Sequence, residues 1–202
     1  MKHLLTLGLG LLLLAACNND DDEVTEPGIT SLNVTPTLVA TSPDVLWTGV
    51  AVTPQGRIFA NFPRMDTDTI PYSVAEVSGS QATPFPDADW NTWSRGTAPQ
   101  NKFVCVQAVY TDDAGALWVL DAASPQMRGV VPGGAKLLKF DPVSKALLQR
   151  VAFSEEVVYP TSYLNDVRVD TQANYAYITD SGAGAIIVVN LADGTSRRLL
   201  GN

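Results

Sequence analysis

The chain is poor in histidine, cysteine and positive charge. Its 202 residues include one histidine, His3, and two cysteines, Cys17 and Cys105. If the N-terminal segment that carries His3 is removed, the chain has no imidazole, which excludes a Ser-His-Asp triad, a histidine base and histidine-ligated metals. Lysine and arginine number 13 against 21 acidic residues and form no basic stripe, so nucleic-acid binding is not expected.

The first residues have the pattern of a bacterial export signal. After Lys2, an apolar run covers Leu4 to Ala16, which is shorter than the ~20 residues that span a membrane and suits a signal peptide. The run ends in Leu-Ala-Ala-Cys17, which resembles a lipobox. This resemblance implies cleavage before Cys17 and lipid attachment to that cysteine. An ordinary secretory signal is the alternative.

We therefore expect a signal peptide over residues 1–16 and an acidic tether over residues 17–28. The protein would be extracytoplasmic, in the cell envelope or on the cell surface, and would meet the membrane only through its lipid anchor. With Cys17 lipidated, Cys105 has no partner for an internal disulfide. Its apolar neighbours, in FVCVQAV, favour a core position over a nucleophile.

The rest of the chain, residues 29–202, has an all-β pattern with an internal repeat. Short apolar or alternating runs are separated by Gly, Pro, Asp and Asn, with no long helical period. Gly56, Gly115 and Asn174, which tolerate a left-handed backbone, recur at intervals of 59 residues. They lie in three similar paired runs: GVAVTPQGRIFANF (49–62), VQAVYTDDAGALWVLD (106–121) and NDVRVDTQANYAYITD (165–180).

Each paired run is followed by two further apolar runs, the second weaker than the first. These lie at 72–77 and 81–86, at 135–141 and 146–153, and at 185–191 and 195–200. Four antiparallel strands per unit are typical of a propeller blade. We predict a partial β-propeller with blades near 40–90, 100–155 and 160–202. A β-sandwich of about twelve strands is the alternative, but it gives no reason for a constant period.

The repeat also carries a family resemblance over roughly residues 40–202. GVAVTPQGRIFANFPR (49–64), LWVLDAA (117–123), AKLLKFD (135–141) and YLNDVRVDTQANYAYITDSGAGAIIVVNLADGTSRRLL (163–200) resemble the bacterial branch of the major royal jelly protein / Yellow family. The resemblance implies a secreted six-bladed propeller, with a ligand-binding central cavity in some members. Insect relatives are linked to pigment formation, nutrition and binding of biogenic amines.

Six blades at this period would need about 350 residues, so the chain would hold three. We consider a fragment first, then a homodimer of two copies that closes the ring, then a second polypeptide that supplies the other blades.

Ligands of propellers bind near the central channel, where the inner strands begin. We therefore predict Thr48, Tyr163, Asn165 and Asp166 as ligand-binding residues for a small molecule. Asn165 and Asp166 also suit a structural role, because such residues cap turns. No residue is assigned as catalytic, and binding is favoured over catalysis.

The Asn165-Asp166 step also resembles six-bladed gluconolactonases and paraoxonases. This resemblance implies that Asn165 contacts a divalent cation such as calcium, which prefers oxygen ligands. The alternative function is therefore a cation-dependent lactonase-like or isomerase-like enzyme. Those enzymes carry a glutamate just before a glycine at the first inner strand, where this chain has Thr48, and the difference weakens the enzyme hypothesis.

Four further charged residues have structural interpretations. Asp121 and Asp180 end equivalent strands, so we expect structural roles for both. Arg64 and Arg168 suit either an anionic ligand or a pair with these acids, and we expect pairing, since a buried arginine needs a partner.

Overall fold

The computed structural model describes residues 34–42 and 44–201. The predicted signal peptide, Cys17 and the whole acidic tether (residues 17–28) lie outside these residues, so their predictions stay untested. No helix in the described ranges is long and apolar enough to cross a membrane. All the strands belong to one compact unit, Leu38–Asn202.

In the described part of the chain, twelve strands form three four-stranded antiparallel sheets, each in chain order. The first sheet contains β1 (Gly49–Val52), β2 (Ile58–Asn61), β3 (Val74–Ser78) and β4 (Gln81–Pro84). The second contains β5 (Val106–Thr111), β6 (Leu117–Asp121), β7 (Lys136–Phe140) and β8 (Leu147–Ala152). The third contains β9 (Leu164–Asp170), β10 (Tyr175–Asp180), β11 (Ala185–Asn190) and β12 (Ser196–Leu199). Two short 3-10 helices, η1 (Asp89–Asn91) and η2 (Pro125–Met127), lie in the loops.

The turns between the first two strands of each sheet explain the 59-residue period. Gly56, Gly115 and Asn174 have φ values of 82°, 84° and 60°. This left-handed conformation is accessible to glycine and tolerated by asparagine. The same turn thus joins the first two strands three times.

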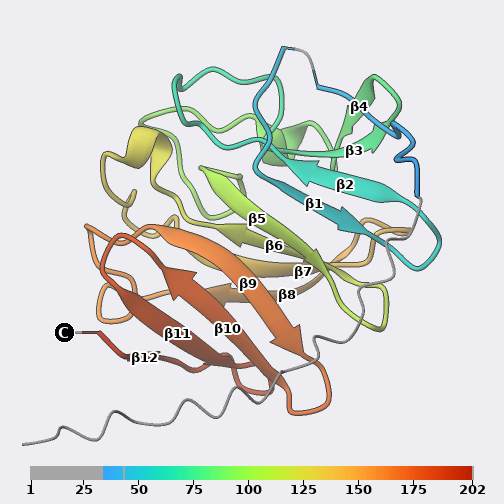
Figure 1. Cartoon of the computed structure of the whole chain (residues 1–202). Coiled ribbons are helices and arrows are strands. Elements are labelled where there is room, and N and C mark those ends of the chain that lie inside the picture. The colour runs from blue at the N-terminus through green and yellow to red at the C-terminus, as the bar shows by residue number, and fades with distance from the viewer. Residues whose placement is uncertain (1–33, 43, 202) are drawn as a thin grey trace, which may run out of the picture. The chain divides into compact units, whose positions relative to one another are not determined.

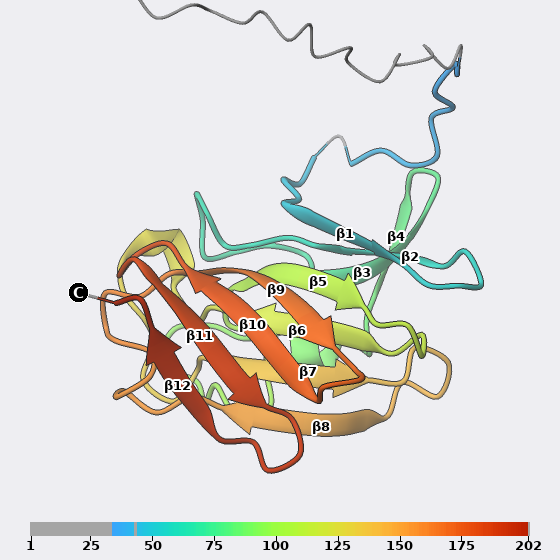
Figure 2. The same ribbon diagram turned by 60° about the horizontal axis from the view of Figure 1, so that its bottom comes forward.

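The three sheets lie side by side through their first strands. Strand β5 contacts both β1 and β9, and Figures 1 and 2 show these strands at the centre of the unit, with the later strands of each sheet running outward. This arrangement of repeated four-stranded meanders is that of propeller blades. The predicted fold class, an all-β partial propeller with about three blades, is confirmed.

Apolar side chains fill the spaces between neighbouring sheets. Trp118 and Leu120 pack with Ala176 and Ile178 of the third sheet. The alternate residues of β6, Leu117 and Val119, pack in a second cluster with residues of the first sheet such as Phe59. Since side chains alternate along a strand, β6 is buried on both faces and reads as the continuous run LWVLD.

The third sheet is covered on one face only. Along β10, Ala176 and Ile178 are fully buried, whereas Tyr175 and Tyr177 are 36% and 44% exposed. The exposed tyrosines occupy the face that points away from the second sheet. The burial of β10 therefore alternates, as expected for a sheet at the end of a stack.

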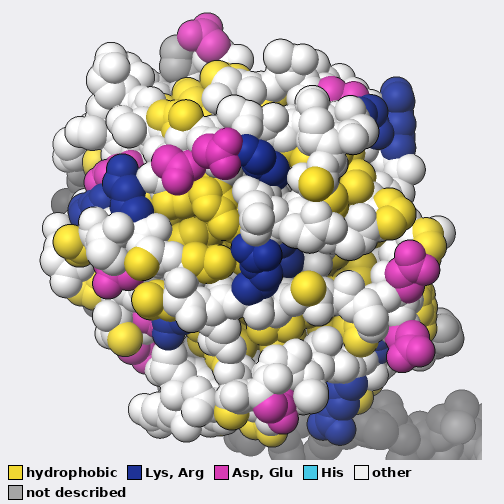
Figure 3. Space-filling model, turned by 180° about the vertical axis from the view of Figure 1, so that it is seen from behind, with side chains coloured by type: hydrophobic (Ala, Val, Ile, Leu, Met, Phe, Trp, Pro, Cys, Tyr) yellow, Lys and Arg dark blue, Asp and Glu magenta, His cyan; other side chains and the backbone are white. Residues whose placement is uncertain are grey.

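Charged side chains are dispersed over the surface seen in Figure 3. Lysines and arginines lie interspersed with aspartates and glutamates on this face. Such mixed charge gives no extended positive surface there for a polyanion.

Candidate functional site

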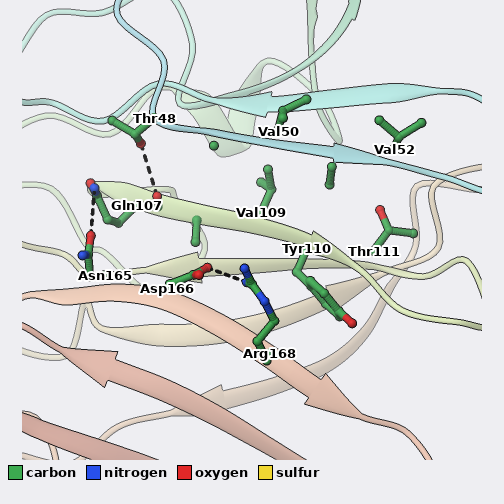
Figure 4. Close-up of a pocket in the computed structure, with 13 residues that line it drawn as sticks. Thr48, Val50, Val52, Gln107, Val109, Tyr110, Thr111, Asn165, Asp166 and Arg168 are labelled. Atoms are coloured by element: carbon green, nitrogen blue, oxygen red, sulfur yellow. Dashed lines mark hydrogen bonds and ion pairs between the residues drawn. The ribbon is translucent and has the colours of Figure 1, made fainter. Parts of the chain in front are cut away.

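The first strands of the three sheets line an open hollow of about 550 Å³, which we call the channel hollow. Figure 4 shows Thr48, Gln107 and Asn165 at one end of it, and Val52 and Thr111 at the other. Its walls include apolar side chains of β1 and β5 and the ring of Tyr110, also in β5. The inner strands therefore bring together residues that are far apart in the sequence.

Thr48 is held at the polar end by the second sheet. Its hydroxyl donates a hydrogen bond to the Gln107 carbonyl oxygen (3.2 Å) and accepts one from the Asn61 side-chain amide (2.8 Å). Asn61 is fully buried and also donates to the Val106 carbonyl oxygen (3.1 Å). Thr48 thus joins the first two blades, whatever its role toward a ligand.

Gln107 links two of the predicted site residues through its side chain. Its Nε2 donates to Asn165 Oδ1 (3.3 Å), and its Oε1 accepts from the Tyr163 hydroxyl (2.8 Å). It lies 59 residues after Thr48 and 59 before Asp166. The repeat places Gln107 at the start of the second inner strand, and its position beside the predicted ligand-binding residues follows from these contacts.

Tyr163 is a neutral hydrogen-bond donor under ordinary conditions. Burial raises the pKa of its hydroxyl to about 12, so the phenol keeps its proton near neutral pH. Its side chain faces a second pocket rather than the channel hollow. Of the four predicted residues, Thr48, Asn165 and Asp166 line the hollow, and Asn165 lines both spaces.

Asp166 and Arg168 form an ion pair on the wall of the hollow. Arg168 Nη1 lies 2.8 Å from Asp166 Oδ1, and both side chains are well exposed. The expected pairing of Arg168 with Asp121 or Asp180 is wrong, because an acid two residues away on the same strand is available. Asp166 Oδ1 also accepts from the N–H of Val167 (2.8 Å), a structural contact.

The side-chain oxygen atoms of Asn165 and Asp166 fit a divalent cation poorly. Calcium takes six to eight oxygen ligands, with carboxylates among them. Here the Asp166 carboxylate is paired with Arg168, and Asn165 Oδ1 accepts from Gln107. Within the described part of the chain, no group of three or more His, Cys, Asp or Glu residues could hold a metal ion.

Asp121 and Asp180 anchor the segments that lead into the inner strands. Asp121 accepts from the N–H groups of Val104, Cys105 and Ala123, each at 2.8 or 2.9 Å, and lies 2.8 Å from Lys136 Nζ. All of these groups are buried.

Asp180 repeats the arrangement one blade later. It accepts from the N–H of Tyr163 (2.8 Å) and lies 2.8 Å from Arg198 Nη1. These contacts are the structural roles expected for Asp121 and Asp180.

Arg64 joins the first and second blades, and no carboxylate among the described residues pairs with it. It is 1% exposed, and its guanidinium donates to the carbonyl oxygens of Phe103 (3.0 Å), Val104 (2.8 Å) and Trp93 (3.1 Å). The expectation of an ion pair was therefore wrong for Arg64. Because a guanidinium has five N–H donors, a ring of carbonyl oxygens can satisfy it instead.

Cys105 occupies the core position expected for it. It is fully buried, and burial raises its thiol pKa to about 12. A thiol that keeps its proton is a poor nucleophile.

Three repeated blades around a shared hollow define this protein as one of the propeller class. A sequence model of the major royal jelly protein family matches residues 104–202, which include the second and third sheets. This segment, 99 of the 202 residues, is similar to that family, which supports the resemblance found in the sequence. No curated protein sequence matches the chain.

Several solved structures resemble the chain at low sequence identity. The extracellular domain of BT4673 from B. thetaiotaomicron aligns with 76% of this chain at 10% identity and a TM-score of 0.48. A protein of unknown function from Bacteroides caccae aligns with 78% at 10% identity (TM-score 0.49), and Kuenenia stuttgartiensis hydrazine synthase with 82% at 15% identity (TM-score 0.44). The aligned parts are 16%, 46% and 38% of those three chains, so this chain spans less than half of each.

Proposed function

We propose that the protein is a lipid-anchored, extracytoplasmic propeller-type protein that binds a small molecule in the channel hollow. The observation that carries this proposal is the hollow itself. Its volume of about 550 Å³ falls in the range of about 300–1,000 Å³ that is usual for small-molecule sites. The lipobox-like Leu-Ala-Ala-Cys17 supports the anchoring and the location.

The lining of the hollow suits a ligand with one polar and one apolar part. Val50 and Val52 are 63% and 54% exposed on its wall and offer an apolar surface. At the polar end, the Asn165 side-chain amide has no hydrogen-bond acceptor among the described residues, so it is free to donate to a ligand. Polar groups that converge beside an apolar surface can orient a ligand in a binding site.

A nuclear magnetic resonance titration of the full chain tests this proposal. Benzylamine, benzyl alcohol and benzoate serve as probes, because they share one apolar ring and differ in charge. We expect at least one probe to cause saturable shifts in the backbone signals of Val50, Val109 and Tyr110. The absence of saturable shifts at these positions with all three probes would contradict the proposal.

A further inference from the structure

A second pocket of about 670 Å³ adjoins the channel hollow and shares Gln107 and Asn165 with it. We call it the loop pocket, since its walls come from the loops after β6, before β9 and after β10. Arg128 lies in the first of these loops, Thr161 in the second and Ser181 in the third. The pocket thus opens beside the starts of the inner strands.

Arg128 is the one charged residue among those that line the loop pocket. Its side chain is exposed and has no ion pair or hydrogen bond to any residue that the structure describes. The chain is acidic overall, with 21 acidic and 13 basic residues. A pocket lined by an arginine and no carboxylate is instead locally positive. Such a site attracts anions, and a guanidinium matches the geometry of an oxyanion.

The loop that carries Arg128 is held in an unusual conformation. Ala123, Gln126 and Met127 have φ values of 50°, 58° and 54°, in the left-handed region that non-glycine residues rarely adopt. Residues in such conformations are strained and persist only where their surroundings hold them.

Hydrogen bonds to neighbouring segments keep the loop that carries Arg128 in this conformation. The N–H of Gln126 donates to the Arg64 carbonyl oxygen (2.7 Å), and the N–H of Val130 donates to the Pro160 carbonyl oxygen (3.0 Å). Arg128 lies between these two anchored positions. Its backbone is therefore fixed at the pocket before any ligand arrives, which lowers the ordering cost of binding.

A neutral hydroxyl group lies beside the arginine in the pocket. Thr161 is exposed and its hydroxyl has no hydrogen-bond partner in the described part of the chain, whereas the Ser181 hydroxyl in the same lining donates to the Tyr163 carbonyl oxygen (3.2 Å). The Tyr163 hydroxyl donates to Gln107 Oε1 (2.8 Å) and so holds Gln107 at the boundary with the channel hollow. Hydroxyl groups beside an arginine are common partners of bound oxyanions.

We propose that the loop pocket binds the oxyanion group of a small molecule, with Arg128 as its positively charged partner. Carboxylates and phosphates share this chemistry. The inference rests on the proposed function, because the same molecule extends past Gln107 and Asn165 into the channel hollow.

The test compares probe affinities in the full chain at constant ionic strength. Dissociation constants for benzoate, benzylamine and inorganic phosphate are measured by the same titration in the natural protein and in Arg128→Gln. Arg197→Gln is the matched control, because Arg197 is also exposed and lines a different pocket. Arg128→Lys keeps the charge without the guanidinium, and the backbone spectrum of each variant reports whether it folds.

We expect benzoate to bind more tightly than benzylamine and phosphate to shift the signals around Arg128. Loss of a charge-assisted hydrogen bond should weaken both anions by about tenfold or more in Arg128→Gln. Arg197→Gln should leave the affinities unchanged, and Arg128→Lys should lose less affinity than Arg128→Gln.

Unchanged anion affinity in a folded Arg128→Gln, or a preference for benzylamine over benzoate, would overturn the inference. If benzylamine shifts the signals of the hollow and neither anion binds, the inference fails while the proposed function stands. If phosphate shifts the signals around Arg128 and no probe reaches the hollow, the proposed function fails, and so does the link between the two spaces.

Discussion

At the residue scale, buried carboxylates keep the inner strands in place. Asp121 is fully buried between backbone N–H groups and Lys136, which is itself 2% exposed. Removal of one partner from such a pair leaves the other charge buried without compensation. The inner strands that line the hollow are therefore held in place by residues that do not face the ligand.

Replacement of Asp121 by alanine tests this role. We expect the free energy of unfolding to fall by about 3–5 kcal/mol, since Lys136 and three N–H groups lose their acceptor. Denaturation by urea measures the change. Asp113→Ala, at an exposed position in the β5–β6 turn, is the control and should stay within about 0.5 kcal/mol. A similar loss in both variants would contradict the assignment.

Asp180 predicts how stability depends on pH. Burial alone would raise its pKa, but hydrogen bonds from Ser162, Arg198 and backbone N–H groups lower the pKa below the ordinary 3.8. The unfolded state then binds a proton more readily, so the stabilisation is complete above the unfolded pKa and is lost as the pH falls through the folded one. We expect the free energy of unfolding to decrease below about pH 4.

The variant Asp180→Asn isolates that contribution. It should be less stable than the natural protein at pH 7 and should lose less further stability on acidification, as measured by urea denaturation at several pH values. An acid dependence as steep as that of the natural protein would show that other carboxylates account for it.

At the scale of elements, strand β10 tests the arrangement of the blades. Ile178 is fully buried against the second sheet, whereas its neighbour Tyr177 is 44% exposed on the opposite face. Truncation of Ile178 to alanine should lower the free energy of unfolding by about 2–5 kcal/mol. Tyr177→Ala should cost much less, because little buried surface is lost. Equal losses in the two variants would contradict the observed stacking.

The elements were largely predictable from the sequence, but their contacts were not. The glycine and asparagine residues at equivalent turns, and the alternation of apolar and polar residues in the strands around them, are local signals. Each segment therefore indicates its own backbone conformation without reference to the rest of the chain. The hydrogen bond between the Gln107 and Tyr163 side chains joins residues 56 positions apart, and no local sequence pattern encodes it. The same holds for Arg64, whose partners are the Ser73 hydroxyl and backbone carbonyl groups, and backbone carbonyl groups carry no side-chain signature.

The site was predictable only in part for the same reason. The starts of the inner strands could be found from the repeat, so Thr48, Asn165 and Asp166 were placed together in advance. Arg128 lies in a loop outside the repeat, and its position beside Tyr163 depends on how two loops pack. Closure of the ring by a second copy of the chain stays a prediction.

At the scale of the whole molecule, calcium distinguishes a binding protein from a cation-dependent enzyme. Because Asp166 is paired with Arg168 and Asn165 accepts from Gln107, we expect neither calcium nor a chelator to change the melting temperature of the full chain. A ligand that binds only the folded state raises that temperature with its concentration. A calcium-dependent rise that is lost in Asn165→Ala would instead favour the enzyme hypothesis.

The most direct test of the account is to fill the channel hollow. Val50 lies exposed on its wall, so Val50→Trp should occupy the space without disturbing the core; Val143→Trp, at a position 79% exposed outside the hollow, is the control. The measurement is the dissociation constant of the probe that binds the natural protein most tightly. We predict that Val50→Trp weakens it by about tenfold or more, a loss of about 1.4 kcal/mol, while Val143→Trp leaves it unchanged. Equal affinities in the two folded variants would contradict the claim that the hollow is the binding site.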